Sequence, residues 1–174
     1  YGPDDDALLA KKENRVTFQK RTGLNVNPEA VVLYWPSRLD PAQKGVELLE
    51  DIALKFVIEH GDVQIAIVGD GIGRDTTHEE NLGRIAWASS GKITFQRFSE
   101  DISMLGYAAA SDVFGASLYE PCGQIDKIGN LFGATATNRD TGGYHDKIGE
   151  LILREDGAPR DEGNGFLFRD YDSG

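Results

Sequence analysis

The chain contains very few of the residues that build disulfide frameworks or metal centres. Its 174 residues include a single cysteine, Cys122, which excludes an intrachain disulfide and suits a reducing compartment. The three histidines, His60, His78 and His145, are too far apart in the sequence to form a metal-binding motif. We therefore expect a fold that is stabilised by an apolar core rather than by cross-links or metals.

Long apolar runs and a surplus of basic residues are missing as well. No segment approaches the ~18 consecutive apolar residues that a membrane-spanning helix needs. Eighteen Lys and Arg residues against 29 Asp and Glu residues give a net charge of −11, which argues against a nucleic-acid binder or an anionic-membrane binder. With 40% hydrophobic and 27% charged residues, the composition is that of one ordinary globular domain spanning residues 1–174.

What the sequence does contain is an alternation of short apolar segments and helical patterns. Strands are predicted at residues 31–35, 63–68, 92–96, 111–116, 134–137 and 165–168. Helices are predicted at 44–60, at about 77–88, from a cap at Ser99, in the segment that ends at residue 132, and around 146–153. This order predicts an α/β fold, a Rossmann-like three-layer α/β/α domain with a parallel sheet of about six strands. The strand-to-helix loops would then share the carboxyl edge of the sheet, where ligands bind.

Two of these loops carry groups that suit a charged, hydroxyl-rich ligand. Arg38 follows the first strand and Lys44 begins the next helix, so the two cations could form a diphosphate site; ordinary surface residues are the alternative. After the fourth strand, Glu120 precedes a Pro-Cys-Gly turn in which Gly123 would let the backbone approach a ligand. Glu120 is expected to accept hydrogen bonds from ligand hydroxyls, with a helix-start glutamate as the alternative. Cys122 is expected to be a small buried residue rather than a nucleophile.

The loops after the second and third strands are less specific. Gly69 and Gly71 flank an aspartate, but their spacing is not that of a dinucleotide fingerprint, so a close backbone turn is favoured over NAD binding. Phe98 follows the third strand and could either stack on a nucleobase or plug the sheet edge.

The loop after the fifth strand contains two consecutive glycines. Thr141 is expected to cap a following helix, and Gly142 and Gly143 to expose backbone N–H groups to an anion. Together with the Glu120 segment, this pattern predicts a site that holds a sugar and a phosphate.

Taken in order, these motifs resemble the C-terminal half of bacterial glycogen synthases and plant starch synthases, which are retaining glucosyltransferases with the GT-B fold. The matching segments, within about residues 12–168, include Arg38-Leu39 with Gln43-Lys44-Gly45, Glu120-Pro121-Cys122-Gly123 and Asp140-Thr141-Gly142-Gly143. The resemblance implies a parent enzyme that transfers glucose from ADP-glucose to the non-reducing end of an α-1,4-glucan. It also implies that no metal ion or other cofactor is used, because cationic side chains and a helix dipole stabilise the departing ADP.

The resemblance further implies a set of site residues. Arg38 and Lys44 would bind the diphosphate, and Glu120 would contact the transferred glucose, as the catalytic residues. Phe98 would stack on the adenine. The other nucleotide-sugar contacts would come from Gly69, Gly71, Cys122, Gly123, Gln124, Thr141, Gly142 and Gly143.

The chain also departs from the family pattern. The loop from Arg38 to Lys44 is one residue longer than usual, Ile125 and Ile128 occupy positions that are often polar or acidic, and Tyr144 replaces a leucine. Two alternatives follow: a related GT-B enzyme that uses UDP-glucose or another donor, and a non-catalytic module that binds a glucan or a protein partner.

The family's N-terminal domain, through which the α-glucan acceptor would bind, and its closing C-terminal helices have no counterpart in this sequence. The domain alone is therefore expected to be inactive. The resemblance places the enzyme in a bacterial cytoplasm, or in a plastid of a plant or alga.

Overall fold

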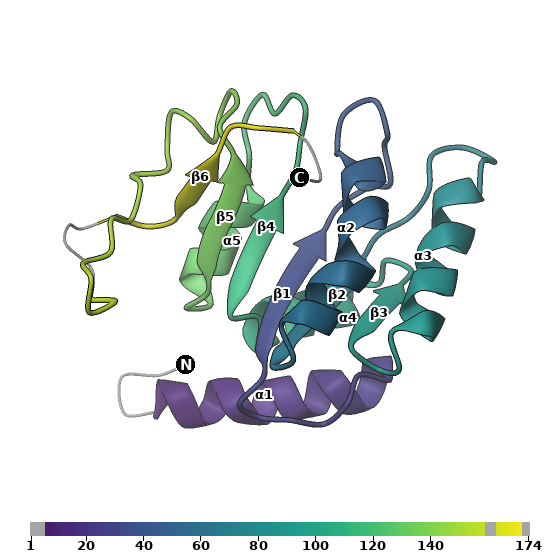
Figure 1. The fold of residues 1–174 in the computed structure, drawn as a ribbon, viewed down its shortest axis with the longest axis horizontal. Coiled ribbons are helices and arrows are strands. Elements are labelled where there is room, and N and C mark those ends of the chain that lie inside the picture. The colour runs from purple at the N-terminus through teal and green to yellow at the C-terminus, as the bar shows by residue number, and fades with distance from the viewer. Residues whose placement is uncertain (1–5, 159–162, 172–174) are drawn as a thin grey trace.

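The computed structural model describes residues 6–158 and 163–171, and a six-stranded parallel sheet forms its centre (Figure 1). The strands are β1 (Val31–Pro36), β2 (Val63–Val68), β3 (Ile93–Gln96), β4 (Asp112–Gly115), β5 (Thr135–Arg139) and β6 (Phe166–Phe168). Their order across the sheet is β3-β2-β1-β4-β5-β6, and every paired strand is parallel to its neighbour. The predicted Rossmann-like α/β fold and its strands are thus confirmed.

Helices lie on both faces of the sheet. Four of them match predicted helices: α2 (Val46–Glu59), α3 (Thr77–Ala88), α4 (Glu100–Ala109) and α5 (Ile125–Leu131). The first two pack on one face, and the other two pack on the opposite face (Figure 1). Ser99 occupies the predicted N-cap position of α4, but its hydroxyl donates to Asp101 Oδ1 at 2.8 Å and makes no hydrogen bond to the helix backbone.

An N-terminal helix, α1 (Ala7–Thr22), was not predicted. Its buried positions include Arg15 and Gln19 beside Phe18, so the apolar spacing that identifies a helix is weak. The capping signals are nevertheless present in the sequence. Asp6 accepts hydrogen bonds from the first helical N–H groups, and Gly23 ends the helix with a φ of +80°.

The helix predicted around residues 146–153 is wrong. The chain forms turns there, and then pairs with the segment just before β6 through a bridge between Glu150 and Gly165. The Leu151 N–H donates to the Gly165 carbonyl at 2.7 Å, and the Asn164 N–H donates to the Gly149 carbonyl at 2.9 Å. These bonds occupy backbone groups that a helix would need, and Gly149 further disfavours a helix.

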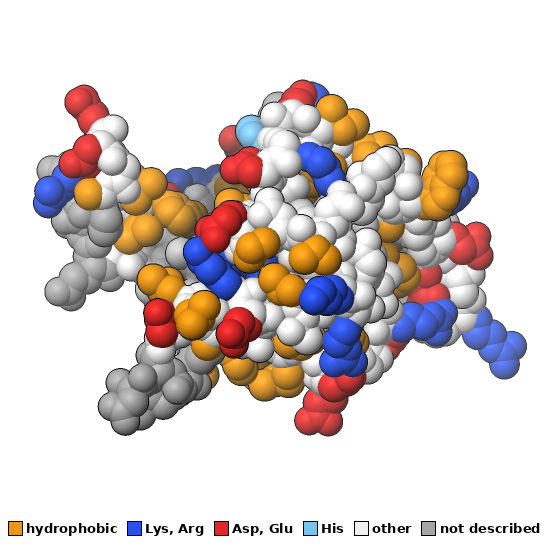
Figure 2. All heavy atoms as spheres, turned by 90° about the horizontal axis from the view of Figure 1, so that it is seen from below, with side chains coloured by type: hydrophobic (Ala, Val, Ile, Leu, Met, Phe, Trp, Pro, Cys, Tyr) orange, Lys and Arg blue, Asp and Glu red, His pale blue; other side chains and the backbone are white. Residues whose placement is uncertain are grey.

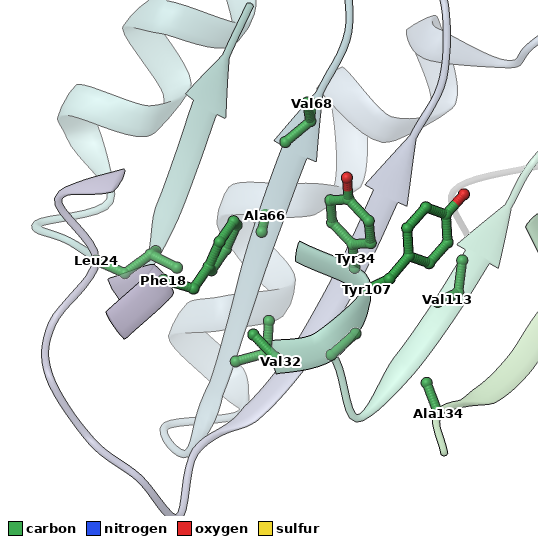
Figure 3. Close-up of a cluster of buried hydrophobic side chains, with 11 residues drawn as sticks. Phe18, Leu24, Val32, Tyr34, Ala66, Val68, Tyr107, Val113 and Ala134 are labelled. Carbon is green, nitrogen blue, oxygen red and sulfur yellow. The ribbon is translucent and has the colours of Figure 1, made fainter. Parts of the chain in front are cut away.

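The core consists of two apolar clusters, one on each face of the sheet. In the cluster drawn in Figure 3, Tyr34 of β1 and Tyr107 of α4 meet edge to face, with ring centroids 5.1 Å apart. Both hydroxyls point toward the carboxyl ends of the strands (Figure 3). The Tyr34 hydroxyl donates to the Ser103 carbonyl at 3.2 Å, which ties α4 to the sheet near the carboxyl ends of the strands.

Among the described residues on the α1 side, the surface carries no extended basic region (Figure 2). Figure 2 shows this face, where acidic and basic side chains are interspersed with small groups of hydrophobic ones. Within the described ranges, none of the helices has the length and apolar character required to traverse a membrane.

Candidate functional site

Two cavities open at the carboxyl edge of the sheet, on either side of the end of β1. The first, which we call the Glu120 cavity, has a volume of about 250 Å³ and is lined by Trp35, Pro36, Ser37, Lys44, Gly115, Ser117, Glu120, Cys122, Gly123, Gln124, Ile125 and Tyr144. The second, the Phe98 cavity, has a volume of about 390 Å³ and is lined by Pro36, Ser37, Arg38, Val68, Gly69, Asp70, Phe98, Ser103 and Tyr107. The two cavities share Pro36 and Ser37, at the end of β1. The strand order reverses at this point, because β1 lies between β2 on one side and β4 on the other. Such switch points form the ligand sites of open α/β sheets.

A buried ion pair lies in the Glu120 cavity. Lys44 Nζ is 2.5 Å from Glu120 Oε2, and the two side chains are only 16% and 11% exposed. The Ser117 hydroxyl donates to the same carboxylate oxygen at 3.1 Å, and the Gly123 N–H donates to the other oxygen at 3.4 Å. The carboxylate therefore has a fixed orientation, with a cation directly beside it.

The longer loop before α2 does not displace Lys44. Asp40 folds the loop into a turn, because its carbonyl accepts the Lys44 N–H at 2.7 Å. Gly45 then adopts a φ of +70°, and a Cβ at this position would lie 2.2 Å from the Ala116 carbonyl oxygen. The Leu118 N–H also donates to the Gln43 carbonyl at 2.8 Å. The loops after β1 and β4 are thus in direct backbone contact, and this contact carries Lys44 to Glu120.

Arg38 lies elsewhere. It is exposed, lines the Phe98 cavity, and donates from Nη2 to Gln43 Oε1 at 3.1 Å. The two cations that we predicted to converge therefore line different cavities, which meet at Ser37. A ligand that spans both cavities would contact both cations.

The Glu-Pro-Cys-Gly turn is built around Gly123. This glycine has a φ of +58°, and a Cβ here would lie 2.5 Å from the Tyr144 ring, so both its conformation and its surroundings require glycine. The prediction that Cys122 is buried is wrong: the thiol is exposed beside the cavity. Gln124 is exposed and lines the cavity, while the side chain of Ile125 packs toward the apolar core.

At the double glycine, the predicted exposure of backbone N–H groups to an anion is wrong for Gly143. The Gly143 N–H donates to the Glu120 carbonyl at 2.8 Å, so it is not presented to a ligand. A Cβ on Gly142 would lie 2.2 Å from the Glu120 carbonyl oxygen, and one on Gly143 would lie 2.3 Å from the Cys122 carbonyl oxygen. These glycines support the Glu120 turn from behind, and Thr141 begins a turn rather than a helix.

Tyr144 forms part of the cavity wall. It is 2% exposed, and burial raises the pKa of its hydroxyl, helped by the Glu120 and Asp126 carboxylates nearby. The hydroxyl therefore stays protonated at neutral pH and can donate a hydrogen bond to a ligand.

In the Phe98 cavity, Gly69 makes a close backbone approach. A Cβ at this position would lie 1.8 Å from the Ser37 carbonyl oxygen, which confirms the backbone-turn interpretation of this glycine. Phe98 is 58% exposed, and its N–H donates to Asp70 Oδ1 at 3.3 Å. An exposed aromatic ring held at a cavity mouth can stack on a planar ligand.

Three further residues build the site without having been predicted as site residues: Trp35, Ser117 and Gln43, the last of which had appeared only as part of a motif. Gln43 connects Arg38 to the loop after β4, since its side-chain amide donates to the Tyr119 carbonyl at 3.2 Å. All three lie at strand ends or next to motifs named above, so their positions in the sequence could have identified them.

Within residues 6–158 and 163–171, no group of three or more His, Cys, Asp or Glu side chains is arranged to hold a metal ion.

The chain is similar over nearly its whole length to glycogen synthases. It is 32% identical over 184 aligned positions to a glycogen synthase of Clostridium botulinum, covering 99% of this chain and 36% of that protein. It is 33% identical to a glycogen synthase of Thermotoga petrophila, covering 98% and 33%. The chain thus spans about a third of the length of these relatives. No family model matches it.

Solved structures give the same result for the fold. The catalytic domain of starch synthase IV from Arabidopsis thaliana, bound to ADP and acarbose, matches with a TM-score of 0.78 and 27% identity, over 95% of this chain and 33% of that one. The Anabaena protein HepE in complex with UDP-glucose matches with a TM-score of 0.68 and 21% identity, over 92% and 40%, a likeness of fold alone. Sequence and fold agree, and the chain is therefore a Rossmann-like GT-B glycosyltransferase domain of the glycogen synthase and starch synthase family.

Proposed function

We propose that this domain binds the nucleotide-sugar donor, and that the enzyme to which it belongs transfers glucose from ADP-glucose to the non-reducing end of an α-1,4-glucan with retention of configuration. The observation that carries the proposal is the Lys44–Glu120 pair in a cavity at the switch point of the sheet. A cation and a carboxylate held side by side match the two parts of such a donor, a diphosphate and a hydroxyl-rich sugar.

In this proposal the sugar occupies the Glu120 cavity. Glu120 would accept hydrogen bonds from the glucose hydroxyls and support the positive charge that develops at the anomeric carbon. Lys44 would neutralise charge on the departing phosphate, together with Arg38 from the neighbouring cavity. The protonated Tyr144 hydroxyl would supply a further hydrogen-bond donor.

The nucleobase would occupy the Phe98 cavity. Phe98 is exposed at its mouth, and the cavity shares Pro36 and Ser37 in its lining with the Glu120 cavity. The preference for adenine is inferred from the structural relative that is bound to ADP. The α-glucan acceptor would be bound by another domain of the same enzyme.

Titration of the chain with ADP, UDP and NADH, followed by amide NMR, tests the proposal. We expect ADP to shift the resonances of Phe98 and Gly123 and to bind more tightly than UDP. The Lys44→Met variant should lose roughly tenfold or more in ADP affinity, because a main cation of the site is removed. Lys127→Met, which removes an exposed lysine of α5, is the matched control.

The other outcomes separate the rival functions. Tighter binding of UDP would indicate another donor, and specific binding of NADH would revive a dinucleotide site. If no nucleoside diphosphate shifts Phe98 or Gly123, the domain is a non-catalytic module and the proposal fails.

A further inference from the structure

Glu79 joins two of the loops that form the Phe98 cavity, although it does not line the cavity itself. It lies in the first turn of α3, and its side chain is only 11% exposed. One carboxylate oxygen, Oε1, accepts the Gly71 N–H at 3.0 Å, and the other, Oε2, forms an ion pair with Arg97. A single carboxylate therefore holds the loop after β2 and the loop after β3.

The first connection extends to Arg38. Gly71 forms a parallel bridge with Leu39, and the Leu39 N–H donates to the Asp70 carbonyl at 2.9 Å. Leu39 is 1% exposed and directly follows Arg38. Fixing Gly71 thus fixes the backbone that presents the Arg38 guanidinium to the cavity.

The second connection extends to Phe98. Arg97 directly precedes this ring, and the Phe98 N–H donates to Asp70 Oδ1 at 3.3 Å. The ring is more exposed than buried, so apolar packing holds it less than it holds a core residue, and the polar contacts of its backbone help to set its position. Without the Glu79 ion pair, the Arg97 side chain next to Phe98 would lose its anchor, and the Phe98 N–H would keep its long bond to Asp70.

From these contacts we propose that Glu79 is a positioning residue, which fixes the Phe98 ring and the Arg38 loop in the geometry that receives the base of the nucleotide. The inference rests on the proposed function, because it assumes that the base enters the Phe98 cavity. Glu79 acts through Gly71 and Arg97 and makes no contact with the ligand. Pre-organising the cavity in this way removes part of the cost of ordering it when the ligand binds.

The role of Glu79 should be visible in ligand binding more than in stability. Arg97 is 68% exposed, and ion pairs with such an exposed partner contribute little to the free energy of unfolding. In Glu79→Gln the amide oxygen can still accept the Gly71 N–H, but the charge that holds Arg97 is lost. In Glu79→Ala both contacts are lost.

The test compares ADP with inorganic pyrophosphate, which has the diphosphate but no base. In Glu79→Gln, which keeps the Gly71 contact and with it the Arg38 loop, we expect the dissociation constant for ADP to rise about fivefold while that for pyrophosphate changes less than about twofold. In Glu79→Ala, which also releases the Arg38 loop, ADP should weaken further and pyrophosphate should weaken as well. The Phe98 amide resonance of the ligand-free chain should also shift or broaden. Glu80→Gln is the matched control, since it removes the adjacent acid of the same helix turn.

Equal losses for ADP and pyrophosphate in Glu79→Gln, or no loss of ADP affinity in either variant, would overturn the positioning role and leave the proposed function intact. If the unmodified chain binds neither ADP nor pyrophosphate, the proposed function itself fails, and this role fails with it. The NMR comparison needs no ligand, so an unchanged Phe98 amide in a folded Glu79→Ala chain would also count against it.

Discussion

Lys44 Nζ lies 2.5 Å from Glu120 Oε2, although the two residues are 76 positions apart in the chain. Lys44 lies in the loop after β1 and Glu120 in the loop after β4, and backbone contacts between Gln43 and Leu118 and between Gly45 and Ala116 bring the two loops together. The pair is largely shielded from water, so each charge needs the other to offset the free-energy cost of its burial.

Removing one partner of this pair should destabilise the fold. We expect Lys44→Met to lower the free energy of unfolding by about 3 kcal/mol, because it leaves the Glu120 carboxylate buried without its cation. The double variant Lys44→Met/Glu120→Gln should recover much of the loss. Urea denaturation of both variants gives the measurement, and a double variant that is no more stable than Lys44→Met would contradict the interdependence.

Arg38 should matter for catalysis far more than for stability. It is exposed, and among the described residues its side chain makes one hydrogen bond, to Gln43. In the enzyme that contains this domain, Arg38→Ala should reduce the rate of glucose transfer by roughly 10²-fold, the scale of losing a main anion-stabilising group. Initial rates with ADP-glucose provide the test, with Arg84→Ala on α3 as the control. Rates equal to those of the unmodified enzyme would refute the role.

Gly45 should tolerate substitution much less than Gly73, although both have a positive φ, +70° and +68°. A Cβ on Gly45 would collide with the Ala116 carbonyl oxygen, whereas a Cβ on Gly73 meets no atom within 4 Å. We expect Gly73→Ala to cost roughly 1 kcal/mol for the left-handed backbone and Gly45→Ala clearly more. Thermal denaturation of the two variants measures the difference, and equal costs would show that the loops can separate at no expense.

Lys11 should make stability depend on pH under alkaline conditions. Burial, with a smaller contribution from the charge of Arg15, lowers the pKa of Lys11 from 10.5 to about 8. Between these values the unfolded chain holds a proton that the folded chain has released, so the free energy of unfolding rises as the pH rises from about 8 to about 10. Lys11→Met should remove this rise, whereas Lys20→Met on the exposed side of α1 should not. Urea denaturation at pH 7.5 and pH 9.5 tests this, and an unchanged slope in Lys11→Met would refute it.

Asn138 should be replaceable by an apolar residue with a gain in stability. It is completely buried on β5, and its amide nitrogen and oxygen make no hydrogen bond to any residue that the structure describes. A buried polar group without a partner costs about 1–3 kcal/mol, so Asn138→Val should raise the free energy of unfolding by about 1 kcal/mol or more. A loss of stability in this variant would indicate that an ordered water satisfies the amide.

Strand periodicity and the order of the motifs predicted most of the fold, because β1 and β2 are near-continuous apolar segments that end in turn residues. The helix α1 could not be identified by the same pattern, since it buries Arg15 and Gln19 against polar partners such as the Ala109 carbonyl and the Gln64 side chain. The helix predicted after Tyr144 does not form, because the backbone at residues 149 and 151 pairs with residues 164 and 165, and this long-range pairing overrides the local helix propensity.

The loops proposed for the site do meet at the carboxyl edge of the sheet, beside two cavities, but the contacts within them could not be predicted. Glycines at positions 142 and 143 indicate a close approach, yet they cannot reveal whether a ligand or another backbone makes it; here the Glu120 turn does. The separation of Arg38 from Lys44 likewise depends on the turn at Asp40 and on the hydrogen bond to Gln43, which no local pattern specifies.

The two cavities draw their walls from different parts of the chain. All lining residues of the Phe98 cavity lie within residues 36–107, whereas eight of the twelve that line the Glu120 cavity lie within residues 115–144. The β1–β4 junction between these parts is short, with only two residue pairs in register. If the base and the sugar occupy the two cavities as proposed, recombination at this junction would exchange most of the sugar cavity and keep the base cavity, so that the two preferences could be engineered as separate traits.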